Sequence, residues 1–283
     1  MKHSLSLGPI ETNSLLIFGG CYGNLEAVQA LFAVAETYGI ANEHIICTGD
    51  LVAYCADPLK TSELLRRKNI RIIQGNCEQA LVKNADECGC GFAENSACET
   101  LSRYWFSYCK SQMNDELIQW FDRLPTHLYF EFGGRRFAVV HGSPNGVSEF
   151  IFASDPEQKL MELIQKSEVD CVISGHAGLP FTQVLGDLCW HNAGAIGLPA
   201  NDGTPRVWYS LIRKKKDGIV FEHNALHYSP QATQEKMKLA KLPREYAQAL
   251  ATGLWPSIDI LPEREKHQTG IALPERKIEW AFS

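Results

Sequence analysis

Four side chains that can bind a metal ion stand where predicted strands end, each beside a glycine. They are Asp50, Asn76, His141 and His176. A carboxylate, an amide oxygen and two imidazoles form a ligand set that suits a borderline divalent metal such as Zn, Fe or Mn. Any one of these residues alone is more typical of a turn or of a satisfied core histidine. Four of them at strand ends favour a metal site.

The elements that must position these residues alternate between apolar strands and amphipathic helices, as in an α/β fold. In the first part of the chain the pattern predicts strands over 15–18, in "HIICTGD" and in "IRIIQGN", and helices over 25–38 and 57–67. Ligands of open α/β sheets bind at the carboxyl ends of the strands. Asp50 and Asn76 are therefore expected to approach one another there.

The rest of the chain supplies the two histidines. "HLYFEFGGRRFAVVHG" predicts a hairpin that ends at His141, and "DCVISGHAG" predicts a buried strand that ends at His176. Strands around Gly186 and a hairpin at Gly218 precede two polar helices and a proline-rich tail after residue 229. The pattern also predicts helices over 98–112, 114–123 and 155–166, whereas 78–97 has little periodicity and is expected to be irregular.

The loop "FGGCYGN", residues 18–24, poses a question. It ends an apolar strand and opens a helix, which is how an active-site loop is built, yet it contains no acid and no histidine.

Composition limits the function classes. A chain of 283 residues, with 45% hydrophobic and 21% charged residues, is typical of one large globular α/β domain or of one domain with an appendage. A net charge of -6 does not provide the basic surface that non-specific nucleic-acid binding needs. The one basic run, Arg213 to Lys216, is expected to be the polar end of a hairpin.

Targeting signals and cysteine usage indicate the compartment. No apolar stretch approaches the ~18 residues of a membrane span, and the N-terminus lacks the apolar core of a secretory signal. A cytoplasmic location is therefore expected. In such a reducing compartment the ten cysteines are expected to be buried hydrophobes, metal ligands or redox groups rather than disulfides.

The motifs resemble those of the calcineurin-like metallophosphoesterases, specifically the small bacterial phosphodiesterase branch. That family's blocks run D-x-H-G-N, G-D, G-N-H-[DE], H-G and G-H-x-H, and this chain has "GCYGN", "GD", "GNCE", "HG" and "GHAG" in the same order. The resemblance extends from about Leu15 to Tyr228. It implies a four-layer αββα fold, a two-sheet β-sandwich flanked by helices, over residues 14–228, with 229–283 as a helical extension and tail packed on it.

The resemblance also implies a site for two metals with a hydroxide between them. Asp50 would bridge the metals, and Asn76, His141 and His176 would complete the second metal's ligands. The first metal's other ligands would stand at positions that hold Gly20, Tyr22 and Gly178 in this chain. One metal site is therefore expected to remain, while the other is vacant or rebuilt. The first-metal loop is "FGGCYGN", which explains its missing side chains.

Other residues are candidates for contact with the substrate. Cys77 replaces the family's histidine that contacts the phosphate, and Tyr22 could donate a hydrogen bond to a phosphoryl oxygen or simply fill the vacated volume. Asn24 opens a helix whose N-terminus favours anions, and Arg206 could reach the substrate or remain a solvated loop residue. Thiolates could also rebuild the lost site, the candidates being Cys21, Cys77, Cys88 and Cys90.

Three functions follow as hypotheses. The first is a metal-dependent phosphohydrolase that acts on a small phosphomonoester or phosphodiester with an atypical or single-metal site. Such an enzyme is expected to be slow, because a single metal lacks the two-metal clamp on the attacking and leaving oxygens. The second is a catalytically silent protein that binds metal and a nucleotide or phosphate. The third is a thiol-metal sensor. The sequence predicts neither a nucleic-acid nor a membrane partner, and it does not indicate the oligomeric state.

Overall fold

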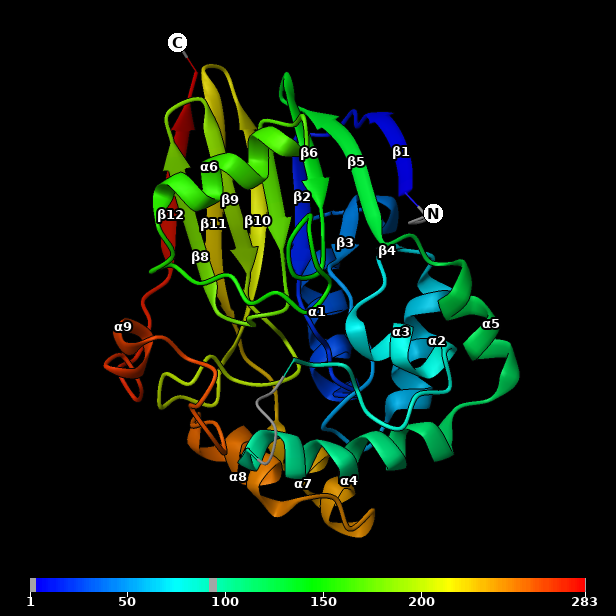
Figure 1. The fold of residues 1–283 in the computed structure, drawn as a ribbon. Coiled ribbons are helices and arrows are strands. Elements are labelled where there is room, and N and C mark those ends of the chain that lie inside the picture. The colour runs from blue at the N-terminus through cyan, green and yellow to red at the C-terminus, as the bar shows by residue number, and fades with distance from the viewer. Residues whose placement is uncertain (1–3, 92–95, 283) are drawn as a thin grey trace.

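Two six-stranded sheets face one another and helices cover their outer faces, as the computed structural model of residues 4–91 and 96–282 shows (Figure 1). This four-layer αββα arrangement confirms the predicted fold class. Among the described residues, no helix is long and apolar enough to cross a membrane.

The first sheet has the strand order β1-β5-β6-β7-β9-β8. The hairpin partners β5 and β6 are antiparallel, whereas β7 runs parallel to both β6 and β9. Its strands are β1 (Ser4–Pro9), β5 (His127–Phe132), β6 (Arg135–Val139), β7 (Cys171–Ser174), β8 (Pro180–Leu185) and β9 (Leu188–Ala193).

The second sheet has the order β12-β11-β10-β2-β3-β4. Strands β2, β3 and β4 are parallel, so their carboxyl ends meet at one edge. The strands are β2 (Ser14–Phe18), β3 (Ile45–Cys47), β4 (Arg71–Ile72), β10 (Val207–Lys215), β11 (Gly218–Leu226) and β12 (Arg276–Ala281).

The strand β2 shows how the sequence builds the layers. Its side chains alternate between faces, so Leu15 and Ile17 pack into the core between the sheets, while Leu16 and Phe18 pack against the outer helices. All four are fully buried. Burial stabilises each such side chain by about 1.5 to 3 kcal/mol, which is why a strand with apolar residues on both faces is central in the sheet.

The helices begin where the sequence provides caps. Asn24 accepts a hydrogen bond from the Ala27 amide at the start of α1, and Asn114 accepts one from Leu117 at the start of α5. The helices are α1 (Leu25–Thr37), the 3-10 turn η1 (Asn42–His44), α2 (Pro58–Lys68), α3 (Asn76–Val82), α4 (Ala97–Gln112), α5 (Asp115–Arg123), α6 (Glu157–Lys166), α7 (Pro230–Leu239), α8 (Arg244–Thr252) and α9 (Glu263–Lys266).

The helices divide between the two outer faces. Helix α6 packs Leu160, Leu163 and Ile164 on the first sheet, and α1 packs Val28 and Leu31 on the second. Figure 1 shows α4, α7 and α8 gathered at one end of the sandwich.

Three segments differ from the sequence prediction. The stretch predicted to be irregular contains most of α3, because Glu78 sits at the third helical position after Gly75 and caps the helix. Strands β1 and β12 were not predicted, since most of their side chains are exposed at a sheet edge and neither has the apolar run that indicates a strand. Part of the predicted irregular stretch, 92–95, lies outside the described residues.

The C-terminal extension is joined to the rest of the molecule by several elements. Helix α7 packs on α1, and β12 pairs with β11 in the second sheet. The division of the chain at residue 228 stays a prediction.

Candidate metal centre and adjoining cavity

Three glycine-containing loops meet at the carboxyl ends of β2, β3 and β4. The loop after β2 is tied to the loop after β3 by backbone hydrogen bonds, since the amides of Cys21 and Tyr22 both donate to the Asp50 carbonyl, at 3.1 and 3.2 Å. Gly75, in the loop after β4, packs so closely that an added β-carbon would lie 2.2 Å from Oδ1 of Asp50. Only glycine fits there, which explains the glycine next to Asn76.

The four predicted metal ligands converge here, Asp50 and Asn76 from behind β3 and β4 of the second sheet, and His141 and His176 from behind β6 and β7 of the first. Nε2 of His141 lies 3.2 Å from Oδ2 of Asp50, 3.0 Å from Oδ1 of Asn76 and 3.1 Å from Nδ1 of His176. Asp50, His141 and His176 each offer a ligand atom within 4.8 Å of the others. The structure therefore brings together all four residues that the sequence singled out.

Backbone carbonyls fix which atom of each ligand faces the centre. Nδ1 of His141 lies 2.7 Å from the Thr48 carbonyl, and Nε2 of His176 lies 3.2 Å from the Cys90 carbonyl. A carbonyl oxygen only accepts, so these nitrogens carry the protons and leave Nε2 of His141 and Nδ1 of His176 as lone pairs. This outer-shell arrangement is typical of metal-binding histidines.

The amide of Asn76 is oriented in the same way. Its Nδ2 donates to the Cys88 carbonyl at 3.0 Å, which turns Oδ1 toward the histidines. One carboxylate oxygen, one amide oxygen and two imidazole lone pairs thus face a common point.

Acceptor atoms this close together require a positive charge among them, either a proton on Nε2 of His141 or a bound cation. Burial by itself would raise the pKa of Asp50, but the neighbouring His141 outweighs it and lowers the value. Burial would lower the pKa of His141, but the Asp50 carboxylate raises it overall. Burial and the nearby His141 lower the pKa of His176 to about 3, so this imidazole stays neutral. The donor set therefore fits a divalent cation held by Asp50, Asn76, His141 and His176.

Glu78 holds the loops together, and sequence reasoning missed this role. Its fully buried carboxylate accepts from the amides of Asp50 at 2.9 Å, Leu51 at 2.8 Å and Gly75 at 2.8 Å. Burial and the Asp50 charge raise the pKa of Glu78 to about 7. The sequence signal was its place in "GNCE", three residues after Gly75, which indicates only a helix start.

The Tyr22 ring fills the space beside Gly20 and Gly178, two positions at which the resemblance predicts first-metal ligands. A β-carbon at Gly20 would lie 2.1 Å from Cε1 of the Tyr22 ring, and one at Gly178 would lie 3.5 Å from its hydroxyl. The residue has a left-handed backbone, φ +48°, and its ring meets Tyr54 edge-on at 4.8 Å between centroids. Its hydroxyl has no hydrogen-bond partner among the residues that the structure describes.

Cys77 lies beside the metal ligands but is 1% exposed and does not line the adjoining cavity. Its amide donates to Oδ1 of Asp50 at 3.2 Å. Burial and the Asp50 charge raise the pKa of the thiol, so it stays protonated. A catalytic role for its sulfur stays a prediction.

The cysteines of the following stretch differ from expectation. Cys88 and Cys90 form a disulfide, with the left-handed Gly89 between them, whereas the sequence predicted thiols throughout. The reason is local, since Gly89 has a φ of +65° and the two Cα atoms lie 5.4 Å apart. Among the cysteines whose side chains the structure describes, seven others are free and buried. In this oxidised form Cys88 and Cys90 offer no thiolate to a metal.

The two predicted phosphate-binding residues lie elsewhere. Asn24 is fully buried, and its Nδ2 donates to the Gly197 carbonyl and the Tyr228 hydroxyl. Arg206 pairs with Asp202 at 3.2 Å and donates to the Leu273 carbonyl. Neither lines the cavity at the metal centre, so the structure does not bring them to the site.

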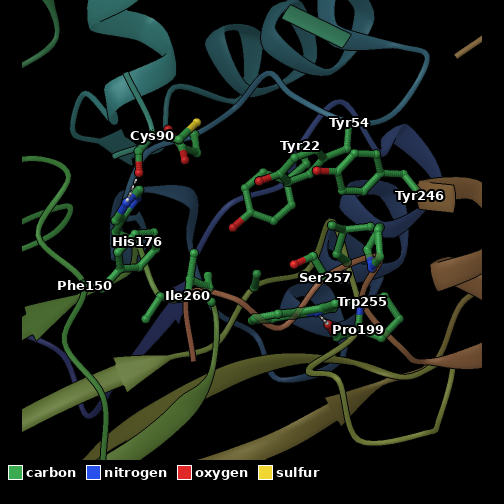
Figure 2. A pocket seen from close by; sticks show the side chains of 16 residues that line it. Tyr22, Tyr54, Cys90, Phe150, His176, Pro199, Tyr246, Trp255, Ser257 and Ile260 are labelled. Atoms are coloured by element: carbon green, nitrogen blue, oxygen red, sulfur yellow. Dashed lines mark hydrogen bonds between the residues drawn. The ribbon is translucent and has the colours of Figure 1, made fainter. Parts of the chain in front are cut away.

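That cavity, which Asp50 and His176 line at one end, is partly open to solvent. Figure 2 shows Tyr22, Tyr54 and Tyr246 on one side of it, with Phe150 and His176 on another. Sequence reasoning missed these aromatic residues apart from Tyr22. They come from distant segments, and no motif indicates that they meet.

Comparisons with known proteins agree with this fold. An uncharacterized protein of Methanocaldococcus jannaschii, MJ0912, is 23% identical over 256 residues, which is 84% of this chain and 98% of the relative. A metallophosphoesterase from Sphaerobacter thermophilus has a TM-score of 0.66 at 23% identity, covering 86% of this chain and 100% of that one. The hypothetical protein PH1004 from Pyrococcus horikoshii has a TM-score of 0.72 at 18% identity, covering 86% and 99%.

The family match extends over most of the sandwich. Residues 16–215 match the calcineurin-like phosphoesterase superfamily domain, and this range includes every predicted metal ligand. Since the match covers well over half of the chain, the protein belongs to the calcineurin-like phosphoesterase superfamily.

Proposed function

We propose that this protein is a metal-dependent phosphohydrolase that acts on a small phosphoester with a single bound metal ion. The observation that carries the proposal is the convergence of four lone pairs from Asp50, Asn76, His141 and His176, with both imidazoles oriented by backbone carbonyls. Zn, Fe and Mn all suit this donor set. The cytoplasmic location that the sequence predicts belongs to the same proposal.

A divalent metal at this point supplies Lewis-acid polarisation of a phosphoryl oxygen and lowers the pKa of a water molecule. The chain supplies position and charge. Glu78 fixes Asp50 through the backbone, and the Thr48 carbonyl holds the proton of His141 on Nδ1. A phosphoryl group at the cavity end would therefore meet a centre that needs no rearrangement, which favours catalysis.

The metal dependence is directly testable. Protein purified without chelator should contain one metal per chain and hydrolyse an aryl phosphate ester, and both properties should be lost in His141→Ala, which removes a ligand. His227→Ala is a matched control, because His227 is exposed and does not line the cavity. Elemental analysis and turnover before and after chelation provide the measurement. Full turnover by metal-free protein would contradict the proposal.

Tyr22 is proposed to donate a hydrogen bond to the phosphoryl group from the side where the first metal is missing. Burial and the Asp50 charge raise the pKa of its hydroxyl, so it remains a donor. Tyr22→Phe keeps the ring and removes the donor. By analogy with oxyanion-hole donors, kcat should fall by about 10²-fold with unchanged metal content. A kcat within twofold of the parent would restrict Tyr22 to filling space.

A second function, a silent protein that binds metal and a phosphate or nucleotide, is favoured by one observation. The Tyr22 ring takes up the volume beside Gly20 and Gly178 that ligands of a first metal would need. Stabilisation of the protein by phosphate esters without turnover of any of them would support this function over hydrolysis.

A further inference from the structure

The residues that line the cavity beside the metal centre indicate which chemical group, attached to a phosphate, could bind there. Its walls are mostly apolar, and they contain five aromatic residues together with Leu198, Pro199, Pro256 and Ile260. Among the described residues that line it, none is a lysine or an arginine, and the carboxylate of Asp50 belongs to the metal centre. A chain of several phosphates would have no positive side chain to neutralise it there.

The aromatic residues form two opposite walls. On one side Tyr54 and Tyr246 stack at 4.4 Å between ring centroids, with Tyr22 edge-on to Tyr54. Figure 2 shows the Trp255 indole on the other side, seen nearly edge-on, so that its flat face borders the cavity. Aromatic side chains on both sides of the cavity suit an aromatic group, which can stack on their faces or meet their edges.

The indole wall is fixed in place. Nε1 of Trp255 donates to the Pro199 carbonyl at 2.7 Å, and its backbone amide donates to Oδ1 of Asn201 at 2.8 Å. A wall anchored at both backbone and side chain loses little freedom when a ligand binds, which favours affinity.

Much of this cavity belongs to the C-terminal part of the chain. Tyr246 lies on α8, and Trp255, Pro256, Ser257 and Ile260 follow it, whereas the superfamily match ends at residue 215. Two of the five aromatic residues, Tyr246 and Trp255, therefore lie outside the matched range that supplies the metal ligands.

We propose that this cavity holds a flat, uncharged aromatic group, such as an aryl ring or a nucleobase, of an ester that carries a single phosphate. The ring lies between Trp255 and the three tyrosines, and the phosphoryl group lies at the Asp50 and His176 end. The proposal deepens the phosphohydrolase function and rests on it for the role of the metal. The binding site itself does not require turnover.

Binding of two non-hydrolysable probes tests the site. In calorimetry with protein as purified, phenylphosphonate should bind about tenfold more tightly than methylphosphonate, as expected when one ring stacks on aromatic side chains. Trp255→Leu should remove most of this difference and leave methylphosphonate binding unchanged. Trp120→Leu, which removes an indole that does not line the cavity, should leave the difference intact.

The outcomes separate the two proposals. Equal binding of both probes, or a preference that survives Trp255→Leu, overturns the aromatic site even if aryl phosphates are hydrolysed. Tighter binding of phosphocholine than of phenylphosphonate overturns it in favour of a cage for a quaternary ammonium group. A Trp255-dependent preference for the phenyl probe supports the aromatic site, and absence of any turnover then counts against the phosphohydrolase alone.

Discussion

Replacing Gly20, Tyr22 and Gly178 together with Asp, His and His should raise the metal content from one ion per chain to two. A second ion needs both an open volume and new ligand atoms. Tyr22 fills the volume that the new ligands need, and the triple variant removes the ring and adds a carboxylate and two imidazoles around Asp50. A second metal would supply the clamp on attacking and leaving oxygens, so turnover of an aryl phosphate should rise by about tenfold or more.

The order of the substitutions matters. Gly20→Asp alone places a β-carbon 2.1 Å from the Tyr22 ring, so this single variant should be destabilised by about 1 to 3 kcal/mol through overpacking. A histidine at position 178 also has to adopt a φ of +65°, which costs about 1 to 2 kcal/mol. Urea unfolding of the single and triple variants measures both effects.

Tyr22→Ala is the matched control for the metal content, because it opens the same volume without adding ligands. Elemental analysis should find one ion per chain in this control and two in the triple variant. A folded triple variant that still binds one ion would show that positions 20, 22 and 178 do not surround a metal position.

The metal ligands could be predicted from the sequence because each of them directly follows a buried strand or a strand hairpin. Asp50 and Asn76 follow parallel strands of the second sheet, and His141 and His176 follow parallel strands of the first, so strand order brings each pair to one sheet edge. The two pairs meet because the two sheets pack face to face, which the family resemblance implied. The resemblance also implied that first-metal ligands are missing at Gly20, Tyr22 and Gly178, although it left open what Tyr22 does.

The aromatic walls of the cavity could not be predicted in this way. Trp255 and Tyr246 reach the metal centre only because α8 and the segment after it pack at the same end of the sandwich. No periodicity in the tail indicates that contact, since it depends on tertiary packing between segments about two hundred residues apart. The disulfide between Cys88 and Cys90 was missed for a related reason, because the expected compartment argued against it.

The role of Glu78 could not be predicted from the sequence either, because its hydrogen-bond partners are backbone amides, which every sequence contains. In the structure, this one carboxylate is the shared acceptor for the loops after β3 and β4. Asp50 has a left-handed backbone, φ +57°, and the turn that holds it has no other side-chain acceptor among the described residues. The position of Asp50 thus depends on Glu78, which contacts its backbone amide.

Glu78→Ala should therefore lower both the stability of the protein and its affinity for metal. It leaves the amides of Asp50, Leu51 and Gly75 without their acceptor in a buried place, and each unpaired donor costs about 1 to 3 kcal/mol. The free energy of unfolding should fall by about 3 kcal/mol or more, and metal affinity by about 10- to 100-fold, as is typical when the support of a ligand is removed.

Glu116→Ala is the matched control for this loss, because Glu116 is an exposed carboxylate that pairs with Arg66 at 2.9 Å. Such surface pairs contribute about 0 to 1 kcal/mol to stability. The free energy of unfolding of this variant should therefore be close to that of the parent. Urea unfolding at neutral pH, with and without chelator, separates the two effects of Glu78→Ala, since the loss of stability should persist in metal-free protein. If Glu78→Ala differs from the parent only in the presence of metal, the carboxylate acts through the metal rather than by holding the loops together.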